Sequence, residues 1–598
     1  MYKIKKVQIS DTNCTILQNR VQRTPNQKLL AYKTESGSWV DITAKTFQKY
    51  VISIAKGLLT SGVKKNDKIG IMSKTSFAWV ALDFAAWTIG AVTVPIYETS
   101  SSHQIEFICN DAEIKILFIE NHQMKTQVDL VKGKLKTIKI IRILNEGALN
   151  ELETIGSSIQ DSEIKKIQSK NKSTDIATIV YTSGSTGKHK GVEVQHKAFL
   201  AIVYSTNEGL PELLQAPDTA ILLFLPLAHI FARFAVLAII EGVSLLALSG
   251  DISALLNDLR YIKPNYIIGV PRIFEKVYNA ASQKAGLGIK GKIFKDAAKT
   301  AIEYSKSLDE NSSLQNMANP KLLAKKILYD NLVFKQIRAV LGNRMKWAVC
   351  GGAALDPDIA HFFRGAGIEV LEGYGLTEIT APAMCNRPGN NKIGTIGLPF
   401  SGVETKIAQD GELIIKTPSV FLGYHNDPEN TKKVLKNGWL WTGDLAEQDS
   451  AGFIKLIGRK KDIIVTAGGK NVSPTALEQI IQSSDLVSHC LVIGDKKPFV
   501  AALITLDMDA VNIWAEKNKI KKLRSKDAAK NKAIAAIIQR SVDEANETVS
   551  RAESVRKFAV LQDEFTVENK CLTASQKIIR QNILNKYKII IDSNIYKK

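Results

Sequence analysis

Short apolar segments alternate with helical segments along most of the chain. The sequence predicts buried strands at Lys68–Met72, Ala91–Tyr97, Ile114–Ile119, Thr137–Leu144, Asn265–Val270 and Met345–Val349. A buried helix is predicted at Phe77–Thr88 and a short one at Gln104–Asn110. The strands are apolar almost throughout, which is typical of parallel strands covered on both faces. The repeated β-α-β units predict an α/β fold whose sheets are doubly wound and mostly parallel.

Past residue 458 the pattern becomes that of a smaller α+β domain. Strand-like segments at Asp462–Thr466, His489–Ile493 and Val500–Leu506 accompany a helix that begins at Pro474. Apolar residues at four- and three-residue steps predict an amphipathic helix through Ile534, Ile538, Val542, Ala545, Val549 and Ala552. We expect this stripe to pack against its own domain. The sequence thus predicts a large N-terminal domain over residues 1–458 and a small C-terminal domain over residues 459–598.

Length and composition fit this division. The chain has 598 residues, of which 45% are hydrophobic, so it is long enough for more than one core. Two long apolar stretches, 77–97 and 219–248, are interrupted by charged residues and prolines, which favours buried core over membrane spans. The six cysteines are far apart and form no C-x-x-C pair, which argues against a disulfide framework or a zinc site. With no signal-peptide pattern near Met1, we expect a cytoplasmic protein.

The charge balance narrows the partners only in part. Eighty basic and 59 acidic residues give a net charge of +21, which suits nucleotides, coenzyme A, an anionic membrane surface or nucleic acid. One dense basic run comprises Lys517, Lys519, Lys521, Lys522, Arg524, Lys526, Lys530 and Lys532. It fits either a solvated helix face or a patch that meets lipid head groups on the cytoplasmic face of a membrane. The chain lacks zinc-finger spacing and an aromatic-rich basic signature, so we expect no nucleic-acid partner.

The segment from Tyr181 to Gly191 carries the strongest chemical signal. It reads Tyr-Thr-Ser-Gly-Ser-Thr-Gly-Lys-His-Lys-Gly and follows an apolar run. Glycines let successive N–H groups turn toward one point, while hydroxyls and lysines add donors and positive charge, as a triphosphate requires. The spacing matches neither a Walker A loop nor a Rossmann fingerprint. A strand-like segment follows, so the loop is expected to join two strands; taken alone, it also fits a polar surface turn.

Four further segments add complementary chemistry. Gly351-Gly352-Ala353 follows an apolar strand, as a backbone closely approached by a flat ligand would. The run from Glu372 to Glu378 offers an aromatic face, a hydroxyl and a carboxylate. Asp444 follows a tight turn and suits paired ribose hydroxyls, and Gly458-Arg-Lys-Lys-Asp462 is a charged linker at the expected domain junction.

In this order, the motifs resemble those of the acyl-adenylate-forming superfamily, which includes acyl-CoA synthetases, luciferases and peptide-synthetase adenylation domains. The resemblance extends from Arg23-Thr-Pro25 to Arg580. The segments 224–233 and 269–278, together with a long insertion around 511–555, are similar to the long-chain fatty acyl-CoA synthetase branch. The chain departs from the family at His189 and Ala354, where prolines are usual, at Ser185, where a threonine is usual, and in its terminal motif.

The resemblance implies a role for each matching residue. The triphosphate loop would comprise Thr182, Ser183, Gly184, Ser185, Thr186, Gly187, Lys188 and Lys190. Adenine would be surrounded by Gly352, Ala353, Glu372, Tyr374 and Gly375, with Thr377 at the α-phosphate and Glu378 as a Mg²⁺ ligand. Asp444 and Arg459 would bind the ribose, Lys461 would be the hinge, and Gly468, Gly469 and Lys470 would line the pantetheine passage. Catalytic roles fall to Thr186, His229 and Lys577.

The resemblance further implies an AMP-forming long-chain fatty acid–CoA ligase that uses ATP, Mg²⁺ and coenzyme A, with a mobile C-terminal domain. Two alternatives stay open at this point. The acyl group could be loaded onto a carrier protein or an amine instead of free CoA, or the chain could be a degenerate nucleotide-binding scaffold. Peripheral membrane association and a homodimer are also left open, and the sequence fixes no acyl chain length.

Overall fold

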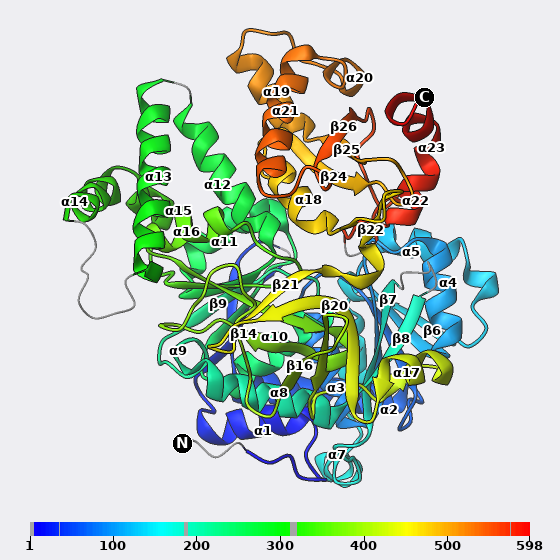
Figure 1. Ribbon diagram of the computed structural model, residues 1–598. Coiled ribbons are helices and arrows are strands. Elements are labelled where there is room, and N and C mark those ends of the chain that lie inside the picture. Colours follow the sequence, from blue (N-terminus) through cyan, green and yellow to red (C-terminus); the bar gives the residue numbers. More distant parts are fainter. Residues whose placement is uncertain are drawn as a thin grey trace. The chain divides into compact units, whose positions relative to one another are not determined.

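The computed structural model describes residues 5–34, 36–183, 189–286, 288–310, 320–573 and 576–597 (Figure 1). The chain divides into two compact units. The N-terminal unit comprises Met1–Thr405 with Ile415–Leu440, and the C-terminal unit comprises Lys406–Ile414 with Trp441–Lys598.

A seven-stranded sheet in the N-terminal unit carries the predicted β-α-β repeats. Its order is β18-β8-β7-β4-β3-β5-β6. The strands are β3 (Lys68–Met72), β4 (Val92–Ile96), β5 (Ile114–Ile119), β6 (Ile140–Ile143), β7 (Ile176–Ser183), β8 (His189–Gln195) and β18 (Gly423–Tyr424). From β7 to β6 all neighbours are parallel, whereas β8 and β18 are antiparallel to their neighbours. The predicted parallel sheet is confirmed, and the loop after Ser183 does join two strands.

A nine-stranded sheet has the order β15-β14-β13-β12-β11-β9-β10-β1-β2. Its strands are β1 (Lys28–Lys33), β2 (Trp39–Thr43), β9 (Ala220–Leu223), β10 (Leu245–Leu248), β11 (Tyr266–Gly269), β12 (Trp347–Cys350), β13 (Glu369–Leu376), β14 (Ala381–Cys385) and β15 (Leu398–Pro399). The middle strands, from β13 to β1, are parallel, and β14, β15 and β2 extend the edges in antiparallel pairs. The α/β prediction is therefore confirmed, with mixed sheets.

Two buried helices of the N-terminal unit are tied together by one ion pair. The helices are α3 (Phe77–Thr88) and α10 (Ile230–Glu241), and both are apolar on nearly every side. Arg233 of α10 donates to both carboxylate oxygens of Asp83 on α3, each at 2.8 Å. The guanidinium also donates to Thr178 of β7 at 2.6 Å and to Thr93 of β4 at 2.7 Å. Because these partners satisfy the buried charges, the pair can exist in an apolar interior.

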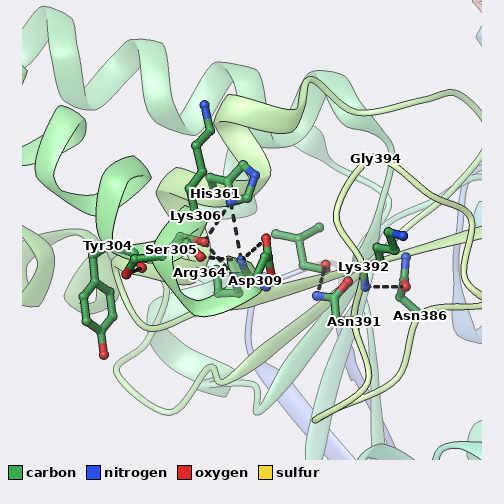
Figure 2. Close-up of polar contacts among 12 residues, drawn as sticks. Tyr304, Ser305, Lys306, Asp309, His361, Arg364, Asn386, Asn391, Lys392 and Gly394 are labelled. Carbon is green, nitrogen blue, oxygen red and sulfur yellow. Dashed lines mark hydrogen bonds and ion pairs between the residues drawn. The ribbon is translucent and has the colours of Figure 1, made fainter. Parts of the chain in front are cut away.

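The described part of residues 271–340 is mainly helical. It contains α12 (Pro271–Ala285), α13 (Ile289–Glu310), α14 (Pro320–Tyr329), a π turn (Asp330–Phe334) and α15 (Lys335–Val340) (Figure 1). Figure 2 shows how α13 is fixed to α16 (Pro357–Gly365). Ser305 of α13 is 2.9 Å from Nδ1 of His361 and accepts from Arg364 Nε at 2.6 Å. Arg364 also donates to the Asp309 carboxylate at 2.8 Å.

The C-terminal unit has a core of its own around the three-stranded sheet β24-β25-β26. These strands are Val487–Ile493, Val500–Leu506 and Val555–Val560, and the helices α18 (Pro474–Gln482), α19 (Met508–Lys517) and α21 (Lys532–Glu547) pack around the same core. The amphipathic prediction is confirmed for Ile534, Ile538, Val542 and Ala545, all of which are buried. The predicted stripe extended too far, because Val549 and Ala552 lie beyond the end of α21.

The cysteines are expected to form no disulfide framework, and the long apolar stretches are expected to form buried core. All six cysteines are free thiols and buried. In the part of the chain that the structure describes, no helix is both long and apolar enough to cross a bilayer.

A buried histidine in the N-terminal unit makes stability depend on pH. His196 begins α8 (His196–Gly209), and its Nδ1 accepts from the Asn13 N–H at 3.2 Å. Burial lowers the pKa of His196 to about 3, so the folded ring stays neutral while the unfolded ring takes up a proton near its ordinary pKa of 6.5. The stabilisation is complete above pH 6.5 and is lost as the pH falls toward 3. At pH 4.5 we expect a loss of about 3 kcal/mol.

The measurement is the urea midpoint of unfolding at pH 7.5 and pH 4.5 for the wild type and His196→Asn. An asparagine still offers an acceptor to Asn13 but cannot be protonated, so the variant should lose less stability on acidification. An equal acid-induced shift in both proteins would contradict this prediction.

Candidate active site

The predicted triphosphate loop connects two paired strands. Thr182 of β7 pairs with Lys190 of β8, and Ser183 pairs with His189. Between them, Gly184, Ser185, Thr186, Gly187 and Lys188 lie outside the described residues. Near the loop, β7 is anchored to Asp111, because the hydroxyl of the buried Tyr181 donates to the Asp111 carboxylate at 2.5 Å. The two ends of the predicted loop are therefore fixed side by side.

Lys190 and Glu378 both interact with Tyr424, a residue that the sequence analysis missed. Glu378 lies in the short 3₁₀ turn Thr377–Ile379 that follows β13. Its Oε1 accepts from the Tyr424 hydroxyl at 2.8 Å, while Lys190 Nζ lies 4.7 Å from the centre of the Tyr424 ring. Tyr424 reaches this position because β18 pairs with β8. Burial and the neighbouring Glu378 raise the pKa of Tyr424, so it remains a hydrogen-bond donor.

The glycine-rich segment and the aromatic segment also meet. Cys350, the last residue of β12, pairs with Glu372 in the middle of β13, and a Cβ on Gly351 would lie 3.5 Å from the Gly373 carbonyl oxygen. The glycine segment therefore begins beside the second half of β13. Gly352 adopts a left-handed φ of +86° and is exposed, as is Ala353. At Gly375, a Cβ would lie 2.1 Å from the Ala381 carbonyl oxygen, so no larger residue fits there. Tyr374 is buried and lies in this same strand.

Glu372 is buried and accepts hydrogen bonds from two backbone N–H groups near the glycine segment. Its carboxylate accepts from the N–H groups of Leu355 at 3.1 Å and Gly394 at 3.4 Å. Burial raises the pKa of Glu372 to about 7, against the effect of these two donors. Beside it, Asn391 donates to the Val370 carbonyl oxygen, and Asn386 accepts from the Lys392 N–H, which Figure 2 shows. The glutamate therefore positions the glycine segment from within.

His229 caps the N-terminus of α10. Its Nδ1 accepts from the Phe231 N–H at 3.2 Å, and the ring is half-buried. The Phe231 ring lies 3.4 Å from the point that a Cβ on Gly351 would occupy. His229 thus caps α10 two residues before Phe231, whose ring lies beside the glycine segment, whereas the catalytic role of His229 stays a prediction.

In the C-terminal unit, the two predicted ribose-binding residues face one another. Asp444 of β20 (Trp439–Gln448) pairs with Arg459 of β21 (Ile454–Arg459), and Arg459 Nε lies 3.3 Å from Asp444 Oδ1. Asp444 is buried. The turn before it is held by Glu412, whose carboxylate accepts from the Gly443 N–H at 2.8 Å and from Lys460 at 3.0 Å. Glu412 is a second residue that the sequence analysis missed.

The remaining predicted residues of the C-terminal unit lie in turns. Lys461 is in the 3₁₀ turn Lys460–Asp462 directly after β21. Gly468, Gly469 and Lys470 connect β22 (Ile464–Val465) with β23 (Asn471–Val472), and Gly469 has a left-handed φ of +75°. All three residues are exposed.

Lys577 lies at the closing end of a narrow turn. Leu572 and Ile578 form an isolated antiparallel bridge. Within it, the Thr573 N–H donates to the Lys577 carbonyl oxygen at 2.8 Å, and the Lys577 N–H donates to the Thr573 hydroxyl at 3.0 Å. This fixes the backbone of Lys577 while its side chain is exposed.

The residues present fit a nucleotide-bound Mg²⁺ ion. Among the described residues, no three His, Cys, Asp or Glu side chains gather as a metal cage. A Mg²⁺ ion that accompanies a nucleotide needs only one or two protein carboxylates, since phosphates and waters supply the other ligands. Glu378, half-buried and oriented by Tyr424, meets that requirement.

An apolar cavity of about 20 Å³ lies in the N-terminal unit. It is lined by residues of α11 (Leu255–Ile262), α12 and the nine-stranded sheet, including Leu259, Phe274 and Ile267. A cavity of this volume holds about one water molecule, so it does not indicate an acyl chain length.

Two family models match most of the chain. Residues 17–425 match the AMP-binding enzyme family, and residues 461–598 match the AMP-binding enzyme C-terminal domain. The long-chain-fatty-acid–CoA ligase FadD15 of Mycobacterium bovis is 39% identical over 568 residues, which are 94% of this chain and 93% of that protein. The long-chain-fatty-acid–CoA ligase ACSBG2 of Gallus gallus is 28% identical, over 96% of this chain and 80% of that protein.

Solved structures show the same fold at lower identity. The anthranilate CoA ligase AuaEII, in complex with anthranoyl-AMP, aligns with a TM-score of 0.73 at 19% identity, over 99% of this chain and 100% of that chain. A Mycobacterium tuberculosis fatty acyl CoA synthetase aligns with a TM-score of 0.63 at 19% identity, over 97% and 98% of the two chains. From the matched family models and the 39% identical relative, this chain belongs to the AMP-binding enzyme family.

Proposed function

We propose that this protein is an AMP-forming long-chain fatty acid–CoA ligase. It activates the acid with ATP as an acyl-adenylate, releases pyrophosphate and transfers the acyl group to coenzyme A. The observation that carries the proposal is the cluster of Lys190, Tyr424 and Glu378 beside the ends of the β7–β8 loop, in a chain whose curated relatives are long-chain fatty acid ligases. The free thiols support a reducing, cytoplasmic site of action.

The chemistry of the first step explains the residue types in this cluster. A fatty carboxylate must approach the α-phosphorus of ATP, so two anions come together and need fixed positive charge and hydrogen-bond donors. We assign Lys190 and the loop that precedes it to the triphosphate, and Thr377 to the α-phosphate. Glu378 would hold Mg²⁺, which neutralises phosphate charge when it is bound.

The nucleoside would be held by the backbone around Gly352 and Tyr374, and its ribose by Asp444 and Arg459. Lys577 would supply a mobile positive charge to the reacting carboxylate and phosphate, which suits a lysine on a flexible stem. No protein nucleophile is required, because the CoA thiol attacks the adenylate and AMP leaves. We further propose that residues 459–598 form a mobile domain with its hinge at Lys461, and that the turn from Gly468 to Lys470 lines the pantetheine passage.

The test is the release of AMP and pyrophosphate that depends on a long-chain fatty acid, together with formation of the thioester. A panel of acids from acetate to long unsaturated chains would define the substrate. Accumulation of acyl-adenylate with CoA present and no thioester would refute ligase activity and favour transfer to a carrier protein. Binding of ATP without turnover of any acid would favour a degenerate scaffold.

Tyr424→Phe should weaken the use of Mg·ATP. The variant keeps the ring beneath Lys190 but removes the hydrogen bond that orients Glu378. A hydrogen bond to a charged group contributes about 1.5–3 kcal/mol, so kcat/KM for ATP should fall about tenfold to a hundredfold, with a higher Mg²⁺ requirement. The matched control is Tyr50→Phe, an exposed tyrosine of the same unit, which should leave both quantities unchanged. An unaltered Mg²⁺ dependence in Tyr424→Phe would contradict the assignment of Glu378.

A further inference from the structure

The outward face of α14 and the π turn after it is apolar at its centre. Ile327 and Leu328 are each 55% exposed, and Leu332 is 48% exposed. Ala324 and Asn331 are exposed on the same side. Steps of three and four residues place these side chains on one face of the helix. Three large aliphatic side chains therefore gather on one exposed helical surface.

The opposite side of this segment is firmly packed. Phe334 is buried with its ring 6.4 Å from that of Phe362 on α16, and the Tyr329 hydroxyl donates to Asp296 of α13. Arg338 donates two hydrogen bonds, of 2.9 and 2.7 Å, to the Asp330 carboxylate.

The helix α13, which Tyr329 contacts through Asp296, is itself fixed to α16 by the Ser305–His361–Arg364 network (Figure 2). The inner face of α14 thus has its partners within the unit. The outer apolar face needs a different explanation, because apolar clusters rimmed by polar residues mark interaction sites.

Positive charge surrounds the apolar centre. Residues 320–340 contain five basic residues and one acidic residue, namely Lys321, Lys325, Lys326, Lys335, Arg338 and Asp330. Asp330 is already paired with Arg338 and lies near Lys326. Lys321, Lys325 and Lys335 are exposed, with Lys325 at the loose distance of 3.8 Å from Asp296. A helix surface with leucines at its centre and lysines at its rim is typical of helices that lie in the head-group region of anionic membranes.

We propose that this surface, the α14 face centred on Ile327, Leu328 and Leu332, docks the protein on an anionic phospholipid bilayer. The aliphatic side chains enter the acyl boundary and the lysines meet the phosphate groups. The choice of a bilayer as the occupant rests partly on the proposed function, since a long-chain fatty acid partitions into membranes. Docking there would place the enzyme where its substrate is concentrated.

A fluorescent label tests the contact directly. Since all six cysteines are buried, Asn331→Cys provides one exposed thiol in the α14 face for an environment-sensitive dye. Leu130→Cys, at a position 66% exposed on the end of α5 (His122–Asp129), is the control site. Vesicles of phosphatidylcholine with one quarter phosphatidylglycerol should shift the emission of the first label to the blue and leave the second unchanged. No shift at residue 331 would overturn the proposal.

Vesicle sedimentation measures the affinity. Binding to the anionic vesicles should exceed binding to pure phosphatidylcholine on the order of a hundredfold, from about fivefold for each of three lysines. Leu328→Gln with Leu332→Gln should weaken binding at least about tenfold, because the apolar area that enters the bilayer is removed. Leu130→Gln is the matched control and should bind as the wild type does. Equal binding by the double variant and the wild type would show that another surface, such as the lysine run 517–532, makes the contact.

Two further measurements separate the alternatives. If the wild type forms a dimer that the double variant does not form, while vesicle binding is unaffected, a second copy covers the α14 face and the proposal is wrong. Ligase activity of both proteins on a short, soluble acid is measured in parallel and should be the same in each. Absence of that activity in the wild type with every acid tested would count against the proposed function, whereas the vesicle results would still decide the docking surface.

Discussion

Lys577→Ala should slow formation of the acyl-adenylate by about a hundredfold to a thousandfold, the usual cost of removing one group that stabilises charge in a transition state. The backbone of Lys577 is held by two hydrogen bonds to Thr573, so a change confined to its exposed side chain should leave the fold intact. Thioester formation from acyl-adenylate and CoA supplied directly should change by less than about threefold. This contrast follows because positive charge beside the α-phosphate is needed when the carboxylate approaches the phosphate anion, whereas in the second step the thiol attacks the uncharged acyl carbon of the mixed anhydride.

The first step is measured by fatty-acid-dependent exchange of pyrophosphate into ATP, and the second by single-turnover formation of acyl-CoA. Lys577→Arg keeps the charge and should recover part of the first rate. Lys588→Ala removes another exposed lysine of the same unit and serves as the control. Equal losses in both steps would contradict a role confined to adenylation, and unchanged exchange would exclude Lys577 as the catalytic lysine.

Sequence patterns predicted the interior of the N-terminal unit better than its edges. The strands Lys68–Met72 and Ile114–Ile119 have the predicted bounds, because continuous apolar runs end at charged or turn residues. The strand expected at 137–144 is shorter, Ile140–Ile143, and lies at the sheet edge, where only one neighbour holds it. Local patterns also gave no sign that β14 and β15 would extend this sheet in antiparallel pairs beyond β13.

The candidate site shows the same division. Residues grouped in one motif, such as Gly352 and Ala353, could be proposed from the sequence because their chemistry is continuous in the chain. Tyr424 and Glu412 could not, since each acquires its role from a distant partner. Tyr424 reaches Glu378 only through the pairing of β18 with β8, and Glu412 reaches Gly443 only across a sheet. A buried polar side chain between two recognised motifs is the structural signal that reveals such residues.

Arg233→Met should destabilise the N-terminal unit by about 3–5 kcal/mol, the cost of leaving one member of a buried ion pair alone. The guanidinium side chain is 1% exposed and that of Asp83 is 6% exposed. Burial raises the pKa of Asp83, and Arg233 opposes that effect. Without the guanidinium, Asp83 would have to be buried as an uncompensated charge or take up a proton. The loss should therefore be greater at pH 8 than at pH 5.

Replacing both partners separates the charge from the packing. Asp83→Leu combined with Arg233→Met should recover most of the lost stability, since well-packed apolar residues often match a buried pair. In that variant the hydroxyls of Thr178 and Thr93 keep acceptors. The Thr178 hydroxyl donates to the Thr93 carbonyl oxygen at 2.7 Å, and the Thr93 hydroxyl lies 3.4 Å from the Ala177 carbonyl oxygen. Arg233→Lys keeps the charge but not the two-pronged contact, and should fall between the wild type and Arg233→Met.

Urea midpoints of unfolding at both pH values report these differences. A double variant no more stable than Arg233→Met would show that Arg233 acts through its packing against Trp87 and Phe199, whose ring centres lie 5.6 and 6.0 Å from the guanidinium carbon.

Adenylate formation in the double variant tests the functional consequence of the ion pair. Besides the ion pair with α3, Arg233 joins α10, which begins after His229, to Thr178 of β7, which ends at the predicted triphosphate loop. If the fold recovers while adenylation stays slow, the ion pair serves to position these two parts of the site.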